Sequence, residues 1–259
     1  MELVPQIESL ANEFTQWRRD IHAHPELGFE EARTADFVAE KLESFGIQVQ
    51  RGVGKTGVVG VLRCGNEPRS IGLRADMDAL PIHENNDFGH RSTHDGTMHA
   101  CGHDGHTVML LAAAKYLAES RDFRGQVNFI FQPAEEGGAG AAKMIDEGLF
   151  ADHQMETVWG MHNWPGLPAG EIAVSEGASM ASADHFEMTV TGRGGHAAMP
   201  HQAIDPVLAA AHIVQALQIL VSRHTNPQDS SVLSITTIHG GSAFNVIPDE
   251  VILLSLIHI

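Results

Sequence analysis

The stretch QVNFIFQPAEEGGAGAAKMIDE, residues 126–147, contains the unit from which the fold is built. Residues 126–131 form a short run rich in valine, isoleucine and phenylalanine, which is typical of a buried strand. Proline and glycines interrupt the run, and residues 138–147 favour a helix. A strand followed by a helix is the repeating element of an α/β domain.

The same alternation extends along most of the chain. Apolar residues at steps of three and four predict helices at 6–22, 30–45 and 105–119. Short β-rich runs predict strands at 57–62, 70–74, 156–161 and 171–175. We therefore expect an α/β domain with a mixed central sheet over residues 1–178.

A different pattern begins near residue 180. It reads as a strand at 185–191, a helix at 203–222, and strands at 231–239 and 246–253. This β-α-β-β order is an incomplete ferredoxin-like α+β module, assigned to residues 179–259. Because chain ends are usually polar and the last residues, LLSLIHI, are apolar, we expect the chain to be truncated.

Charge and cysteine content narrow the class of protein. The 259 residues include 33 acidic and 16 basic side chains, for a net charge of −17. Nucleic acids and anionic membranes bind basic patches, so neither is an expected partner. Two cysteines, no signal peptide and apolar runs too short to span a bilayer favour the cytoplasm.

The stretch HACGHDGH, residues 99–106, admits three interpretations: a metal site, a cysteine nucleophile with its base, or a polar turn. Cys101 and His103 are suitable ligands for a borderline divalent metal, and a following helix would favour the Cys101 thiolate. We interpret His99 and His106 as solvated bystanders and expect Asp104 to cap the helix. RADMDALP, residues 74–81, adds two aspartates after a strand, where α/β sheets gather ligands.

Later strands also end in polar side chains. Glu135 and Glu136 follow the strand at 126–131, and His162 follows the strand-like run 158–161. One glutamate could bind a metal while the other acts as a general base, although an acidic first helical turn is an alternative. The coincidence of such groups at several strand ends favours a metal site over any single structural explanation.

Together these segments resemble the amidohydrolase branch of the M20 metallopeptidases, which includes hippurate hydrolases, N-acyl-amino-acid aminoacylases and auxin-conjugate hydrolases. Seven motifs carry the resemblance: HPELGFEE (24–31), RADMDALPI (74–82), HACGHDGH (99–106), PAEEGGAGA (133–141), MHNWP (161–165), GRGGHAAMPH (192–201) and FNVIPD (244–249). The resemblance implies a zinc-peptidase-like catalytic domain and a lid domain that forms homodimers.

The resemblance also implies roles for particular residues. It implies two divalent ions, manganese, zinc or nickel, with Cys101 as bridging ligand and His103, Glu136 and His162 as further ligands. Glu135 resembles the general base, and Asp78 resembles the acidic residue that orients a ligand. In the lid domain, His196 resembles a histidine that stabilises the oxyanion, and Asn245 resembles a substrate-binding residue.

Members of this family are longer than this chain, and the expected truncation removes one further histidine ligand. The leading hypothesis is hydrolysis of N-acyl amino acids by a metal-activated water, with the acyl and amino-acid specificity left open. One alternative is an inactive metal-binding fragment. The other is a cysteine-nucleophile amidase that uses Cys101.

Overall fold

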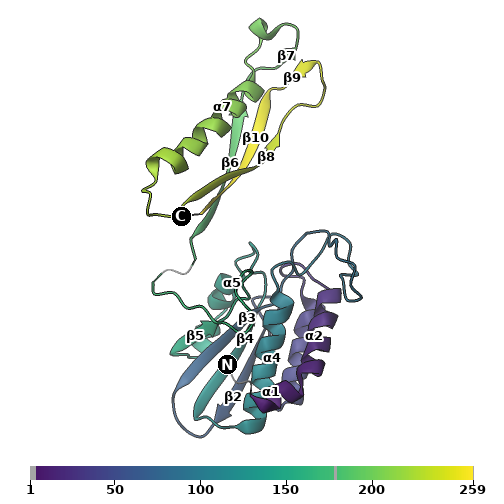
Figure 1. The fold of residues 1–259 in the computed structure, drawn as a ribbon, viewed down its shortest axis with the longest axis vertical. Helices are drawn as coiled ribbons and strands as arrows, with labels where there is room; N and C mark the ends of the chain where they lie inside the picture. The colour runs from purple at the N-terminus through teal and green to yellow at the C-terminus, as the bar shows by residue number, and fades with distance from the viewer. Residues whose placement is uncertain (1–3, 178–179, 259) are drawn as a thin grey trace. The chain divides into compact units, whose positions relative to one another are not determined.

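The computed structural model describes residues 4–177 and 180–258. The chain divides into two compact units, Met1–Glu171 and Ile172–Ile259 (Figure 1). This division falls before the boundary expected after residue 178. The first unit has one sheet and the second has two, and each unit has its own apolar core.

The first unit contains a five-stranded sheet in the order β1-β2-β4-β3-β5. Its strands are β1 (Gln48–Val53), β2 (Gly57–Cys64), β3 (Ser70–Asp76), β4 (Gly125–Gln132) and β5 (Thr157–Gly160). Strand β3 runs parallel to β4 and β5, while β2 is antiparallel to β1 and β4. The predicted mixed α/β sheet is therefore confirmed, and the carboxyl ends of β3, β4 and β5 lie at one edge.

Helices cover both faces of this sheet (Figure 1). They are α1 (Pro5–Ser9), α2 (Ala11–Ala23), α3 (Ala32–Ser44), α4 (His103–Ser120), α5 (Gly140–Asp146) and α6 (Leu149–Asp152). Side chains of β4 alternate between the faces, as a strand requires. Phe129 and Phe131 pack with α2, α3 and α4, while Ile130 packs with Met144 and Leu149.

The second unit has a three-stranded antiparallel sheet covered by one long helix. The strands are β6 (Ala183–Thr191), β10 (Glu250–His258) and β8 (Val232–His239), in that order, and a small pair joins β7 (Gly195–His196) to β9 (Val246–Ile247). Helix α7 (Pro206–Ile219) packs Ala210 against Val251 and Leu253. The three longer strands and α7 follow the predicted β-α-β-β order, although the strand predicted at 246–253 is divided between β9 and β10.

Helix α7 begins with a side-chain cap. The Asp205 carboxylate accepts from the Val207 and Leu208 amides at 2.8 and 3.3 Å, and Pro206 occupies the first turn. With the π-helical segment η2 (Leu220–His224), it gives a 19-residue stretch of mean hydropathy 1.3. Contrary to expectation, this stretch is long and apolar enough to cross a membrane by length and composition alone, as core helices of soluble proteins also can be.

One predicted strand is absent from the described structure, and one observed strand was not predicted. Residues 171–175 form no strand in the described structure, and their side chains are exposed. Their apolar residues suggested a strand, but pairing with a neighbouring strand decides whether one forms. Strand β1 was missed because its polar sequence, QVQRGV, shows little apolar alternation; it forms by pairing with β2.

Candidate metal centre

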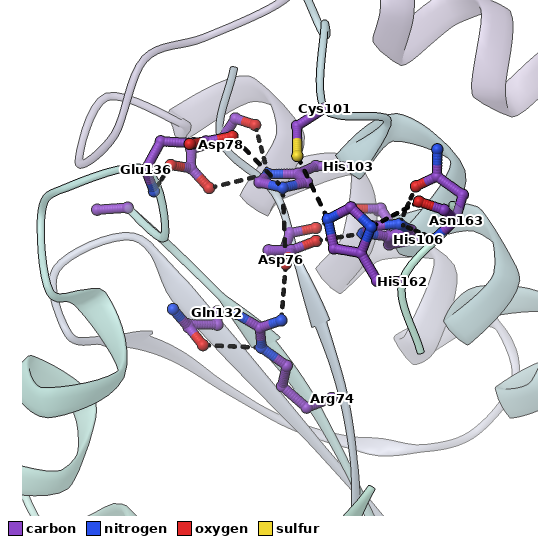
Figure 2. A network of polar contacts seen from close by, with 12 residues as sticks. Arg74, Asp76, Asp78, Cys101, His103, His106, Gln132, Glu136, His162 and Asn163 are labelled. Carbon is purple, nitrogen blue, oxygen red and sulfur yellow. Dashed lines mark hydrogen bonds and ion pairs between the residues drawn. The ribbon is translucent and has the colours of Figure 1, made fainter. Parts of the chain in front are cut away.

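The parallel edge of the first sheet gathers the site residues predicted in the first unit, most of which are labelled in Figure 2. Asp78 lies two residues beyond β3, Glu135 and Glu136 follow β4, and His162 follows β5. Helix α4 begins at the same place and carries His103 as its first residue, with Cys101 just before it. Residues far apart in sequence thus form one cluster.

His103 is the central residue of this cluster. Its Nδ1 lies 2.9 Å from the Asp78 carbonyl oxygen and 3.2 Å from the Asp78 carboxylate, so this nitrogen carries the donated proton. Its Nε2 is buried and has no hydrogen-bond partner among the described residues. An unpartnered buried nitrogen is costly, and a metal ion is one ligand that would satisfy it.

Three sets of side chains around His103 place their ligand atoms within 4.8 Å of one another. They are Cys101, His103 and His162; His103, Glu135 and Glu136; and Asp76, His103 and His106. Thiol, imidazole and carboxylate groups together suit zinc, manganese and nickel. The donor set and the free Nε2 atom therefore fit a divalent metal.

Cys101 lies against His162, with 3.3 Å between Sγ and Nε2. His162 Nδ1 donates to the Asn163 carbonyl oxygen at 2.6 Å, which leaves Nε2 to accept from the thiol. Burial, a hydrogen bond with Glu136 and the charges of Glu136, Glu135 and Asp76 raise the pKa of Cys101 to about 12. The expected thiolate is thus wrong for the protein alone, and a nearby cation would reverse this effect.

Asp78 connects the metal-ligand candidates to each other. Its Oδ1 faces His103, and its Oδ2 accepts from the Glu136 amide at 2.9 Å. Burial raises the pKa of Asp78, but hydrogen bonds from His103 and from the Glu136 and Glu135 amides outweigh burial and lower it. Asp78 is therefore placed to orient both His103 and the loop that carries the glutamates.

Glu135 stands beside the cluster with a partly protected carboxylate. Burial, followed by the negative charge of Glu136, raises the pKa of Glu135. His103 opposes the shift less strongly. A carboxylate with a raised pKa is better suited to accept and release a proton near neutral pH than an ordinary glutamate.

The interpretation of His106 as a solvated bystander was wrong. His106 is buried, and its Nδ1 lies 2.6 Å from Asp76 Oδ1. Its Nε2 accepts from the Asn163 amide at 3.0 Å, next to His162. His106 lies three residues after His103, so both project from the same face of α4. That spacing is the signal by which it could have been found.

Asp76, the first of the two aspartates in RADMDALP, was given no role of its own but belongs to the cluster. It accepts from His106 and, at 2.7 Å, from Arg74. Burial raises the pKa of Asp76, but these two partners and the charge of His103 outweigh burial and lower it to about 2. The buried carboxylate is therefore ionised and holds His106 in place.

Asp104 and His99 also differ from expectation. Asp104 does not cap α4, whose N-cap is Gly102; it is buried and bonds His22 and Arg18 at 3.0 Å each. His99 is buried, and neither of its ring nitrogens has a partner among the described residues. Burial lowers the pKa of His99 to about 4, which keeps it neutral. Both residues lie next to His22 of α2, a tertiary contact that the sequence does not display.

His196 and Asn245 lie in the second unit, which is described by itself. His196 in β7 pairs with Val246 in β9, and the Ala197 amide donates to the Asn245 carbonyl oxygen at 3.0 Å. The two residues are therefore neighbours, and both are exposed. Their roles in the site therefore stay predictions.

Comparison with known proteins gives consistent results. The chain is 51% identical to a hippurate hydrolase of Campylobacter jejuni over 96% of its own length, and 45% identical to an N-acyl-L-amino acid amidohydrolase of Geobacillus stearothermophilus, also over 96%. The crystal structure of the YXEP protein of Bacillus subtilis, a dinuclear metal-binding peptidase, matches 97% of the chain with 38% identity and a TM-score of 0.76.

The match does not extend over the whole of these proteins. The chain spans 65% of the length of the hippurate hydrolase, 68% of the amidohydrolase and 65% of the YXEP chain. The profile of Peptidase family M20/M25/M40 matches residues 72–256, which include the whole cluster around His103 and most of the second unit. The chain therefore belongs to peptidase family M20/M25/M40.

Proposed function

We propose that this chain carries the metal centre of an amidohydrolase that cleaves the amide bond of N-acyl amino acids. The observation that carries the proposal is the buried Nε2 of His103, which has no hydrogen-bond partner among the described residues and lies among a thiol, a second imidazole and two glutamates. Similarity to a hippurate hydrolase and to an N-acyl-L-amino acid amidohydrolase supports the substrate class.

Four residues would hold two divalent ions: Cys101, His103, Glu136 and His162. Bound ions of this kind lower the pKa of water toward neutrality and polarise a carbonyl group. Manganese, zinc and nickel all suit the mixed sulfur, nitrogen and oxygen donors. Asp78 would keep the His103 proton on Nδ1 and so keep Nε2 directed at the metal.

Glu135 would act as the general base. Its carboxylate would take a proton from the attacking water and later deliver it to the leaving nitrogen. From the second unit, His196 would stabilise the oxyanion and Asn245 would contact the substrate. We further propose a cytoplasmic protein that forms homodimers; its two cysteines, Cys64 and Cys101, are both free thiols.

The direct test is Glu135→Gln, with Glu119→Gln on the exposed side of α4 as the control. We expect Glu135→Gln to bind Mn²⁺ as well as the unmodified chain and to lose about 10²- to 10⁴-fold in turnover of hippurate. Full turnover by the metal-loaded variant would show that another group is the base. Metal binding without turnover by the unmodified chain would support the inactive-fragment alternative.

The contact between Cys101 and His162 favours a second candidate, a cysteine-nucleophile amidase. A thiol whose pKa is about 12 is almost entirely protonated at neutral pH, which weakens this candidate. The two functions respond differently to reagents. A metal-dependent enzyme loses activity with a chelator and regains it with Mn²⁺ or Zn²⁺, whereas a cysteine nucleophile is indifferent to chelation.

A further inference from the structure

The segment HPELGFEE, residues 24–31, contributes no candidate ligand, but it contacts the loops that follow β3 and β4. Leu27 pairs with Ala79, and the Ala79 amide donates to the Glu26 carbonyl oxygen at 2.8 Å, just after Asp78. A Cβ atom added to Gly28 would lie 3.0 Å from the Ala134 Cβ and 3.7 Å from Asp78 Oδ2. The segment therefore touches both loops that carry site carboxylates.

Glu31 ends this segment and is completely buried. Its Oε1 accepts from the Ala134 amide at 2.8 Å, and its Oε2 accepts from the Thr56 hydroxyl at 2.5 Å. A buried carboxylate is costly unless such partners satisfy it, so its position is closely defined. Glu31 thus connects the start of α3 to the residue immediately before Glu135.

Ala134 has a left-handed backbone conformation, with φ of 48°. This conformation is unfavourable for alanine and persists only where the surroundings hold it. Here Glu31 binds the amide before the two glutamates, and Asp78 binds the Glu136 amide at 2.9 Å. The turn that presents Glu135 and Glu136 is therefore held between two buried carboxylates.

We infer that Glu31 is a positioning residue for the Glu135–Glu136 turn, through the reach of its carboxyl group and its hydrogen bond to Ala134. Only the expected effect of Glu31 on metal binding rests on the proposed function, because Glu136 is a proposed metal ligand. The hydrogen bond itself can be tested without metal. Reach and charge can also be separated, because glutamine keeps the reach while aspartate keeps the charge.

The first experiment is amide hydrogen exchange of the metal-free full chain, followed by mass spectrometry over residues 132–140. Glu31→Ala and Glu31→Asp should accelerate exchange there by about tenfold, because Ala134 loses its acceptor. Glu31→Gln should exchange within about threefold of the unmodified chain, since its carbonyl oxygen can still accept from Ala134. If Glu31→Ala does not fold, the test is made with Glu31→Asp alone.

The matched control is Glu26→Ala, in the same segment. The Glu26 carboxylate accepts from the Arg33 and Thr34 amides at 2.9 and 2.8 Å and so caps α3 without touching Ala134. Its loss should lower thermal stability but leave exchange over 132–140 unchanged. The inference would be overturned if Glu26→Ala accelerated exchange as much as Glu31→Ala. It would also be overturned if Glu31→Asp exchanged like the unmodified chain while Glu31→Gln did not.

The second experiment is Co²⁺ titration followed by visible absorption. Glu31→Ala and Glu31→Asp should bind Co²⁺ about 10- to 100-fold more weakly, while Glu31→Gln and Glu26→Ala should match the unmodified chain. Unchanged affinity in Glu31→Ala would contradict the inference. If the unmodified chain bound no Co²⁺, the proposed function would fail, and the exchange experiment would still decide the role of Glu31.

Discussion

At the scale of single residues, His106 determines the position of the loop that carries His162. Its two ring nitrogens join buried Asp76 to the Asn163 amide, at 2.6 and 3.0 Å. We expect His106→Ala to weaken Co²⁺ binding about 10- to 100-fold, because the neighbour of a proposed ligand loses its anchor. Absorption titration measures this effect. His153→Ala, which removes a histidine bonded to Gln50 on β1, is the control and should bind normally.

Asp76 makes stability depend on pH. Its pKa is about 2 in the folded protein, below the ordinary value of 3.8, so ionised Asp76 stabilises the fold above about pH 4. This contribution, about 2 kcal/mol, is lost as the pH falls from about 4 to about 2. With a chelator present, the free energy of unfolding in urea should depend less steeply on acidic pH for Asp76→Asn than for the unmodified protein. Identical slopes would contradict the assignment.

At the scale of elements, the backbone turn that leads into α4 requires a glycine at position 102. This residue has φ of 84°, and an added Cβ would lie 2.5 Å from Asn163 Nδ2. Gly65, in a turn with φ of 71°, has nothing within 4 Å of such an atom. We expect Gly65→Ala to cost about 1–2 kcal/mol from backbone strain alone. Gly102→Ala should cost more in unfolding free energy.

Comparison of the two glycine variants distinguishes the effect of backbone strain from the effect of displacing Asn163. In Gly102→Ala the methyl group pushes against Asn163, next to His162, so Co²⁺ affinity should fall along with stability. Gly65→Ala should lose stability while keeping its Co²⁺ affinity. Equal affinities in the two variants would mean that the contact with Asn163 does not position His162.

The elements themselves were largely predictable where apolar periodicity was strong. Strands β2, β3 and β4 and helices α3 and α4 closely match the runs that predicted them, while the single helix predicted at 6–22 is divided into α1 and α2. Strand β1 was not predictable, because only its pairing with β2 makes it a strand. Residues 171–175 show the converse, since an apolar run without a neighbouring strand remains irregular.

At the scale of the whole molecule, the edge where β3, β4 and β5 end could be predicted to gather polar residues, because a parallel sheet aligns its carboxyl ends. The partners of those residues could not be predicted. Arg74, His106 and Asn163 acquire their roles only through contacts between elements, and Glu31 reaches Ala134 from 103 positions away. Sequence motifs identified the candidate ligands, and tertiary packing identified what holds them.

All four proposed ligands lie in the first unit, so metal should stabilise that unit selectively. At a free concentration of Mn²⁺ about 100 times its Kd, binding adds about 2.7 kcal/mol to the free energy of unfolding of this unit. Amides that open only when the unit unfolds should then exchange about a hundredfold more slowly. Hydrogen exchange with and without Mn²⁺ should therefore show new protection in β3, β4 and α4. Strands β6, β8 and β10 should exchange at unchanged rates. Equal protection in both units would instead show that the second unit contributes to metal binding. Loss of the protection in His103→Ala would confirm that it arises from the proposed centre.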